Sequence, residues 1–147
     1  MTYQQIADKW GTLADIASKK HGVRSTLILA VIRQESSGLE NAISPAKCYG
    51  LMQISKFALA DYNGNNGTST IDSELFIPEV NIEIGTWYLR WLIRTLKSEF
   101  DALRAYNIGI GTVKKGKTLF GSDGTKYASS VLDHELQFIS LTANKTA

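Results

Sequence analysis

The amino-acid sequence predicts a mainly α-helical fold of about six to seven helices in one domain. Its 147 residues are the usual length of a single domain and too few for two. Apolar residues recur every three or four positions along several segments, which is the pattern of a helix with one buried face. Only two prolines interrupt the chain, and no pair of alternating segments predicts a β-hairpin.

The N-terminal part of the chain predicts two helices. Apolar residues over positions 3–17 follow the helical period, and Gly22 is a suitable stop. Ser25 can cap a second helix that continues to about Ser36. This helix contains the longest apolar run, residues 27–32, whose six residues are far fewer than the roughly 20 needed to span a membrane. We therefore expect no membrane insertion.

The middle of the chain alternates between chain breaks and helices. Two glycines and a proline within residues 38–50 indicate a loop, after which Ser55 can cap a short helix over 56–62. The Asn- and Gly-rich run 63–69 predicts a turn-rich surface loop. A long amphipathic helix should begin near Pro78, because proline suits the first turn of a helix.

The C-terminal part predicts a short helix, an exposed loop and a final helix. Asp101 can start the short helix, which Gly109 and Gly111 end. Residues 114–124 are rich in lysine and glycine and predict an exposed, mobile loop. The last helix should cover about residues 125–141, with these side chains inward: Tyr127, Val131, Leu132, Phe138 and Ile139.

Composition excludes several classes of function. Sixteen basic and fourteen acidic residues give a net charge of +2, which is too small to indicate nucleic-acid binding. The single cysteine excludes an internal disulfide, and two histidines are too few for a His-rich metal site. The N-terminus has neither a basic segment nor an apolar segment of the kind found in secretory signal peptides. We expect a soluble protein without one.

Glu35 is the most unusual acidic residue. It lies four positions after Val31 and seven after Ile28, so it extends the apolar stripe of its helix. Partial burial there would raise the pKa of the carboxyl, and a carboxylic acid protonated near neutral pH is suited to general-acid catalysis. The alternative is a glutamate at a helix end that simply turns to solvent. The sequence places no second carboxylate nearby, so spacing alone does not predict a two-carboxylate glycosidase.

Four short motifs occur in a recognisable order: Glu35-Ser36, Ala42-Ile-Ser-Pro-Ala46, Gly50-Leu-Met-Gln-Ile54 and Ala105-Tyr-Asn-Ile-Gly109. In this order and spacing the chain resembles the family 1 lytic transglycosylases, the soluble lytic murein transglycosylase (SLT) catalytic domains with a goose-lysozyme-like fold. Asn81-Ile-x-x-Gly85-x-x-Tyr88-Leu89 and Tyr127 are similar to two further stretches of that family. The resemblance covers roughly residues 13–132. It implies one SLT-like catalytic domain, spanning residues 1–147, with a substrate cleft.

The resemblance implies a role for each matching residue. Glu35 matches the catalytic acid/base, and Ser44 matches the residue that contacts its carboxyl. Ser36 matches a position that can form a hydrogen bond at the helix end, and Met52 and Gln53 match positions of the glycan groove. Tyr106 and Asn107 match the pair beside the reacting sugar, and Tyr127 matches the tyrosine of a further motif. Without the motif order, core packing would be the preferred reading of Met52 and Tyr106.

The chain departs from the family pattern at three places. Lys47-Cys48-Tyr49 replaces a stretch that often contains Gly-Ala, which changes the loop over the cleft. Lys56 stands where the family has proline, and Asp123 stands near the position of a sugar-contacting glutamate. Cys48 itself is expected to be a packed side chain rather than a nucleophile. These departures concern substrate preference and leave Glu35 unaffected.

The implied reaction needs one enzyme carboxyl and no metal or organic cofactor. Glu35 would protonate the glycosidic oxygen between MurNAc and GlcNAc, while the N-acetyl group of the substrate stabilises the cationic sugar. The ionised Glu35 would then take the proton of the 6-hydroxyl, which closes to 1,6-anhydro-MurNAc. The expected partner is the glycan strand of peptidoglycan, bound by a monomer.

Three other functions stay open at this point. A lysozyme-type muramidase would admit water in place of the 6-hydroxyl. A non-catalytic glycan-binding or virion structural module would keep the cleft without turnover. DNA binding is the least favoured function. The sequence has one basic cluster, which comprises Lys114, Lys115 and Lys117. We expect this cluster to be a solvated loop, with weak electrostatic binding to the anionic cell wall as the alternative.

The expected place of action is the bacterial cell wall. A wall-cleaving domain without a signal peptide fits a phage endolysin released through holin pores, a virion component, a secretion or conjugation enzyme, or an excised catalytic domain. The amino-acid sequence does not distinguish among these delivery routes.

Overall fold

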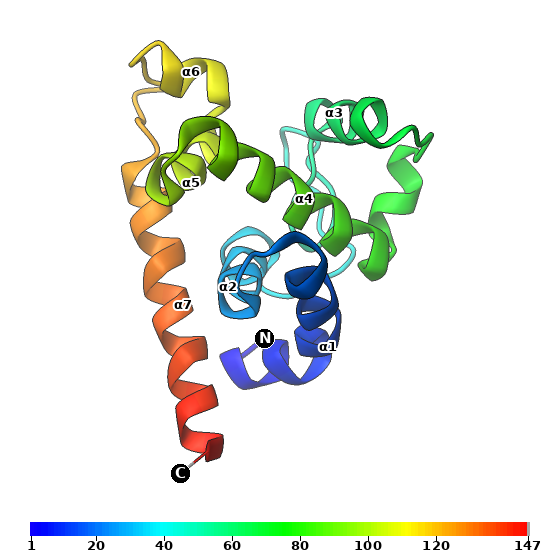
Figure 1. Ribbon diagram of the computed structural model, residues 1–147, viewed down its shortest axis with the longest axis vertical. Coiled ribbons are helices and arrows are strands. Elements are labelled where there is room, and N and C mark those ends of the chain that lie inside the picture. Colours follow the sequence, from blue (N-terminus) through cyan, green and yellow to red (C-terminus); the bar gives the residue numbers. More distant parts are fainter. Residues whose placement is uncertain (147) are drawn as a thin grey trace.

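The computed structural model describes residues 1–146 and confirms the mainly helical fold (Figure 1). No helix in this range is both long and apolar enough to cross a membrane. The described chain contains seven α-helices and one 3₁₀ helix: α1 (Tyr3–His21), α2 (Ser25–Ser36), α3 (Lys56–Asn66), η1 (Asp72–Phe76), α4 (Pro78–Leu96), α5 (Glu99–Ile108), α6 (Ile110–Lys114) and α7 (Thr125–Thr146).

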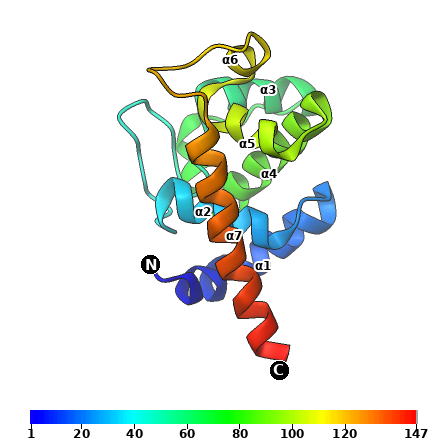
Figure 2. The ribbon, with the colours of Figure 1, turned by 90° about the vertical axis from the view of Figure 1, so that its left-hand side faces the viewer.

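Helix α2 forms the centre of the core. All six residues from Leu27 to Ile32 are buried, so this stretch has no solvent-facing side. Helices α1 and α7 pack against α2, while α4 packs against α1, α3 and α5. Figure 2 shows α7 running lengthwise across α2, with α3 and α6 gathered at the opposite end from the C-terminus. A helix buried on every side can leave the core only at its ends, and Glu35 lies at one of them.

The first helix agrees with its prediction, and the second differs at its start. Helix α1 ends at Gly22, whose left-handed backbone (φ 72°) provides the predicted stop. The prediction that Ser25 caps α2 is wrong. Arg24 occupies the N-cap position, and the Ser25 hydroxyl instead donates to the Asp15 carboxylate at 2.6 Å. Ser25 is thus the first residue of the helix, and its side chain is engaged by α1.

Helix α3 is longer than its sequence pattern predicts. Ser55 caps it as predicted, accepting from the backbone N–H of Ala58. The predicted loop over 63–69 is wrong for its first part, because the helix continues to Asn66. The side-chain amides of Asn65 and Asn66 donate to backbone carbonyls one turn earlier, at 2.8 Å each, and these bonds stabilise a final turn rich in weak helix formers.

The next helices show smaller differences. Helix α4 starts at Pro78 as predicted, whereas η1 before it was not predicted. Helix α5 starts at Glu99 rather than Asp101, because Ser98 is the N-cap and accepts from the Asp101 N–H. Gly109 ends α5 as predicted. Gly111 does not end a helix, since it lies inside the short α6.

The C-terminal helix corrects one predicted core position. Of the predicted exposed loop over 114–124, residues 115–123 are exposed as predicted, whereas Lys114 ends α6 and Gly124 is buried. Helix α7 is longer than predicted and reaches Thr146. Ile139 is 44% exposed, so its prediction as a core residue is wrong. The inward face carries buried Glu135 instead, whose carboxylate accepts from Arg24 Nε at 2.8 Å and from the Thr26 hydroxyl at 2.7 Å.

Replacing Glu135 with alanine should lower the free energy of unfolding by about 2 kcal/mol, because it removes the buried acceptor of Arg24 and Thr26. Glu99→Ala removes the more exposed partner of the same arginine and should cost less than about 1 kcal/mol. Urea denaturation of both variants measures the two values. Equal losses would contradict the expectation that the buried Glu135 stabilises the fold more than the exposed Glu99 does.

Candidate active site

A cavity of about 710 Å³ lies beside the end of α2. Its size is within the range of ligand pockets in proteins. Helix α2 contributes Glu35, while the loop before α3, α3 itself, α4, α5 and the segments around α6 supply the remaining walls. The candidate residues among its lining are Glu35, Ser44, Gln53, Tyr106 and Asn107. The structure thus brings five of the eight sequence-predicted site residues to one cavity.

Glu35 is half-buried at the C-terminal end of α2. The helix ends because Ser37 adopts a left-handed backbone (φ 55°), so the chain turns away directly after Glu35 and Ser36. Burial raises the pKa of the Glu35 carboxyl to about 7, and the hydroxyl of Tyr127 nearby opposes this rise. The carboxyl is therefore half protonated near neutral pH, which is the property required of a general acid.

Tyr127 brings α7 close to the Glu35 carboxyl. The residue is buried, and its hydroxyl makes no hydrogen bond of good geometry within residues 1–146. Burial and the negative charge of Glu35 both raise the pKa of the Tyr127 hydroxyl well above its usual value. A neutral phenol that faces the carboxyl without a fixed partner can donate to it once the carboxyl ionises.

The loop between α2 and α3 is held by one buried amide. Asn81 on α4 is fully buried, and its Oδ1 accepts from the Met52 N–H at 2.7 Å. Its Nδ2 donates to the carbonyls of Tyr49 and Leu75, both at 2.8 Å. Gly50 has φ +76°, and a Cβ there would collide with the Asn81 amide and the Leu75 carbonyl. The loop can therefore pack this closely on α4 only with glycine at position 50.

The two neighbours Met52 and Gln53 have different environments. The expectation that Met52 lines the groove is wrong for its side chain, which is fully buried. It packs against Gly85 of α4, where a Cβ would lie 2.5 Å from the Met52 sulfur. Gln53 does line the cavity. Its Nε2 donates to the carbonyls of Ala42 and Gly50, and these bonds hold its left-handed backbone (φ 53°).

Tyr106 and Asn107 form the α5 wall of the cavity. The Tyr106 hydroxyl donates to the Met52 carbonyl at 2.7 Å, and its ring lies 5.7 Å from that of Tyr88. Burial, followed by the charge of Glu35, raises the pKa of Tyr106 well above its usual value, so the phenol stays neutral. Asn107 is exposed at the cavity surface. Tyr106 thus joins α5 to the loop before α3, within the electrostatic influence of Glu35.

The hydroxyls of Ser44 and Ser36 both form hydrogen bonds with backbone groups. Ser44 lines the cavity, and its Oγ accepts from the Cys48 N–H at 3.1 Å. Cys48 lines the same wall. Its pKa is raised by burial and by the charge of Glu35, with the Ser44 hydroxyl opposing this. Ser36 is buried, where it donates to the Ile32 carbonyl and accepts from the Gly38 N–H. These bonds correspond to the helix-end role considered for Ser36.

Among the departures from the family pattern, Cys48 lines the cavity, whereas Lys47, Lys56 and Asp123 do not. Lys47 is exposed, and its neighbour Cys48 faces the cavity instead. Lys56 is exposed, with its Nζ 5.3 Å from the centre of the Phe57 ring. Asp123 lies in a separate surface depression, and a hydrogen bond from the Thr125 N–H lowers the pKa of its carboxyl.

The lining also contains residues that were not among the predicted site residues, including Phe57, Asp61 and Tyr88. Tyr88 belongs to one of the stretches that resemble the family, but no site role was assigned to it. Phe57 and Asp61 lie four residues apart in the predicted helix over 56–62, so their shared face was predictable. The direction of that face depends on how α3 packs on α4, which local spacing does not encode. Asp61 and Glu35 are the only charged side chains of the lining. Within residues 1–146, no three His, Cys, Asp or Glu side chains gather into a metal-binding group.

Comparison with known proteins gives one consistent match. Residues 12–128 match the transglycosylase SLT domain family. The chain is 34% identical over 136 residues to membrane-bound lytic murein transglycosylase C of Klebsiella pneumoniae, covering 85% of this chain and 37% of that protein. It is 40% identical over 93 residues to membrane-bound lytic murein transglycosylase E of Buchnera aphidicola, covering 60% of this chain and 43% of that protein. The chain therefore spans well under half the length of these relatives.

Solved structures show the same fold. The lytic transglycosylase Slt of Pseudomonas aeruginosa matches with a TM-score of 0.82 and 23% identity, over 92% of this chain and 24% of that chain. The 70 kDa soluble lytic transglycosylase of Escherichia coli matches with a TM-score of 0.80 and 23% identity, over 90% and 24% of the two chains. The predicted lysozyme-like SLT fold is thus confirmed.

Glu35→Gln should stabilise the protein at alkaline pH. The carboxyl has a pKa of about 7 when folded and an ordinary value of 4.5, so the folded state binds its proton more tightly. Stability from this group is complete below about pH 4.5 and is lost as pH rises through 7. Urea denaturation should find the variant about 2–3 kcal/mol more stable than wild type near pH 8, and equal near pH 4. A stability difference that does not change with pH would contradict the burial of this carboxyl.

Proposed function

The chain belongs to the transglycosylase SLT domain family, and on that premise we propose that it is a peptidoglycan lytic transglycosylase. The family match over residues 12–128 agrees with the resemblance inferred from the motifs over 13–132. The observation that carries the proposal is the half-buried Glu35 carboxyl, with a pKa of about 7, in a cavity that also holds Tyr106, Asn107 and Gln53. The proposed substrate is the glycan strand of peptidoglycan, cleaved between MurNAc and GlcNAc.

In the proposed reaction Glu35 acts twice. The protonated carboxyl donates to the glycosidic oxygen, and the bond from that oxygen to carbon 1 of MurNAc breaks with its electron pair leaving on oxygen. The N-acetyl group of the same MurNAc stabilises the cationic carbon. Ionised Glu35 then takes the proton of the 6-hydroxyl, whose oxygen bonds to carbon 1. The carboxyl returns to its protonated state, and the product is 1,6-anhydro-MurNAc without added water.

The surroundings of Glu35 suit both steps. Burial keeps the proton on the carboxyl before the reaction, as the raised pKa indicates. The Tyr127 hydroxyl lies near enough to stabilise the ionised form between the two steps. Tyr106 is held neutral beside the same cavity, with its hydroxyl occupied by the Met52 carbonyl. We infer that Tyr106 shapes the site and leaves proton transfer to Glu35.

A lysozyme-type muramidase is the competing enzyme activity, because Asp61 is a second carboxyl in the same cavity as Glu35. Glycosidases that hydrolyse their substrate with water usually use two carboxyl groups. However, the groups that set the pKa of Glu35 are its burial and Tyr127, whereas the charge of Asp61 acts on Tyr88. Asp61 therefore belongs to the α3 end of the cavity, and we favour the transglycosylase reaction.

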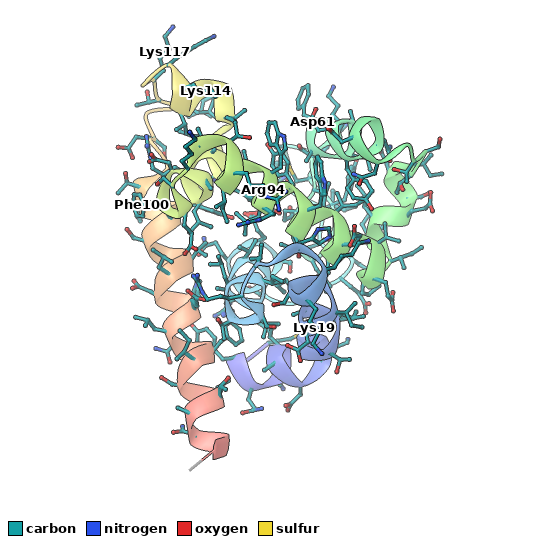
Figure 3. All side chains as sticks on the ribbon, viewed as in Figure 1. Lys19, Asp61, Arg94, Phe100, Lys114 and Lys117 are labelled. Carbon is teal, nitrogen blue, oxygen red and sulfur yellow. The ribbon has the colours of Figure 1, made fainter. Side chains whose placement is uncertain are left out.

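We infer that the chain acts on the bacterial cell wall, where its proposed substrate lies. Delivery by a phage holin, a virion or a secretion apparatus stays a prediction, as do the monomeric state and an endolysin role. Lys114 at the end of α6 and Lys117 in the loop after it lie at one end of the molecule (Figure 3), and the cavity residue Leu119 follows two positions after Lys117.

Glu35→Gln should lower the rate of wall cleavage by about 10²- to 10⁴-fold, because the amide cannot donate the required proton. Turbidity of purified cell walls follows the rate, and circular dichroism verifies that the variant folds. Substantial residual cleavage would overturn the role of Glu35. In wild-type digests, mass spectrometry should find anhydro ends, which are lighter than reducing ends by one water. Reducing ends alone would identify a muramidase instead.

The pH dependence of cleavage should follow the protonation of Glu35. Because the acid form starts the reaction, the initial rate should fall as pH rises through about 7, approaching tenfold per pH unit above it. Rates measured from about pH 5 to about pH 9 at constant ionic strength test this expectation. A rate that is still rising at the alkaline end would contradict a reaction that begins with a proton on Glu35.

A further inference from the structure

Asp61 is an unpaired carboxylate on the wall of the proposed glycan cleft. It lies on α3 (Figure 3), lines the same cavity as Glu35 and is exposed. Its backbone carbonyl accepts from the Asn65 amide, but its carboxylate makes no hydrogen bond or ion pair within residues 1–146. A carboxylate left free inside a cleft is available to a ligand, and it can only accept hydrogen bonds.

Two aromatic side chains flank this carboxylate. Phe57 lies one helical turn before Asp61, lines the cavity and is 72% exposed. The Nζ of Lys56, which is not a lining residue, lies 5.3 Å from the centre of the Phe57 ring, so this ring already faces one ammonium group. Tyr88 lines the cavity from α4, and its pKa is raised by burial and then by the charge of Asp61, which indicates that the two side chains are close. The Tyr88 ring is held by stacking on Trp91, with the ring centres 6.1 Å apart. The Tyr88 part of the aromatic surface next to Asp61 is therefore preformed.

The charges of the cavity favour a cation. No lysine, arginine or histidine is among its lining residues, although the whole chain carries a net charge of +2. With Glu35 half protonated near pH 7, Asp61 contributes the fixed negative charge. A carboxylate beside aromatic rings is a combination that binds ammonium groups, because the charge and the negative ring faces attract the same ligand.

We propose that Asp61, Phe57 and Tyr88 form a subsite for an amino sugar that carries a free ammonium group at carbon 2, as in a de-N-acetylated glycan. The inference rests on the proposed function and deepens it, since it names a preferred substrate class for the same cleft. The ammonium-bearing ring would lie at the α3 end, away from Glu35. The ring that reacts keeps the N-acetyl group that the proposed chemistry requires. Asp61 is thus a specificity-determining residue that takes no part in bond cleavage.

Binding to a variant that does not turn over tests the subsite. In the Glu35→Gln background, calorimetry compares a glucosamine oligomer with an N-acetylglucosamine oligomer of equal length, at slightly acidic pH where the amine is protonated. We expect the glucosamine oligomer to bind about threefold or more tightly at low salt, with the preference shrinking at high salt. Adding Asp61→Asn should abolish the preference. Adding Asp133→Asn, which removes an equal charge from an exposed position on α7, should preserve it.

Three results would overturn the subsite. These are no preference for the glucosamine oligomer, a preference that survives Asp61→Asn, or an equal loss on Asp133→Asn. The last would assign the effect to net charge rather than to the cleft. Because the assay measures binding and not cleavage, failure of the proposed reaction would appear in the wall assay and failure of the subsite in this one.

Discussion

The burial of α2 is the constraint on which the rest of the structure depends. Residues 27–32 are all buried, and α1 and α7 cover them. Glu35 follows three residues after this stretch, at the place where the helix leaves the core. Its carboxyl is therefore largely shielded from solvent but still reaches the cavity, and this burial raises its pKa to about 7. Core packing and acid strength are two consequences of one helix position.

A second constraint joins the core to the cavity. Asn81 is buried in α4 and holds the loop before α3 through two hydrogen bonds, one from the Met52 N–H and one to the Tyr49 carbonyl, while a third bond reaches the Leu75 carbonyl of η1. Met52 in turn packs on Gly85 and accepts from the Tyr106 hydroxyl. A single buried amide thus fixes both the loop and the α5 wall relative to Glu35. This explains why Met52, which does not line the cavity with its side chain, stands within a site motif.

Sequence reasoning succeeded where the information is local and failed where it depends on packing. The helical periods of α1 and α4 and the Pro78 start are visible in short windows, and the motifs located the cavity residues Glu35 and Tyr106. The inward position of Glu135 depends on its hydrogen bonds with Arg24, which lies 111 residues away in the chain. Asp61 reaches the cavity through the packing of α3, for the same kind of reason.

Direct titration of Glu35 tests the central claim. The ¹³C chemical shift of its side-chain carboxyl, followed by NMR as pH is varied, reports protonation at that one atom group. The account predicts a midpoint near 7 in wild type and a higher one in Tyr127→Phe, because the tyrosine hydroxyl lowers the pKa. A midpoint near the ordinary 4.5 would contradict it, since the carboxyl would then be ionised before any glycan arrived.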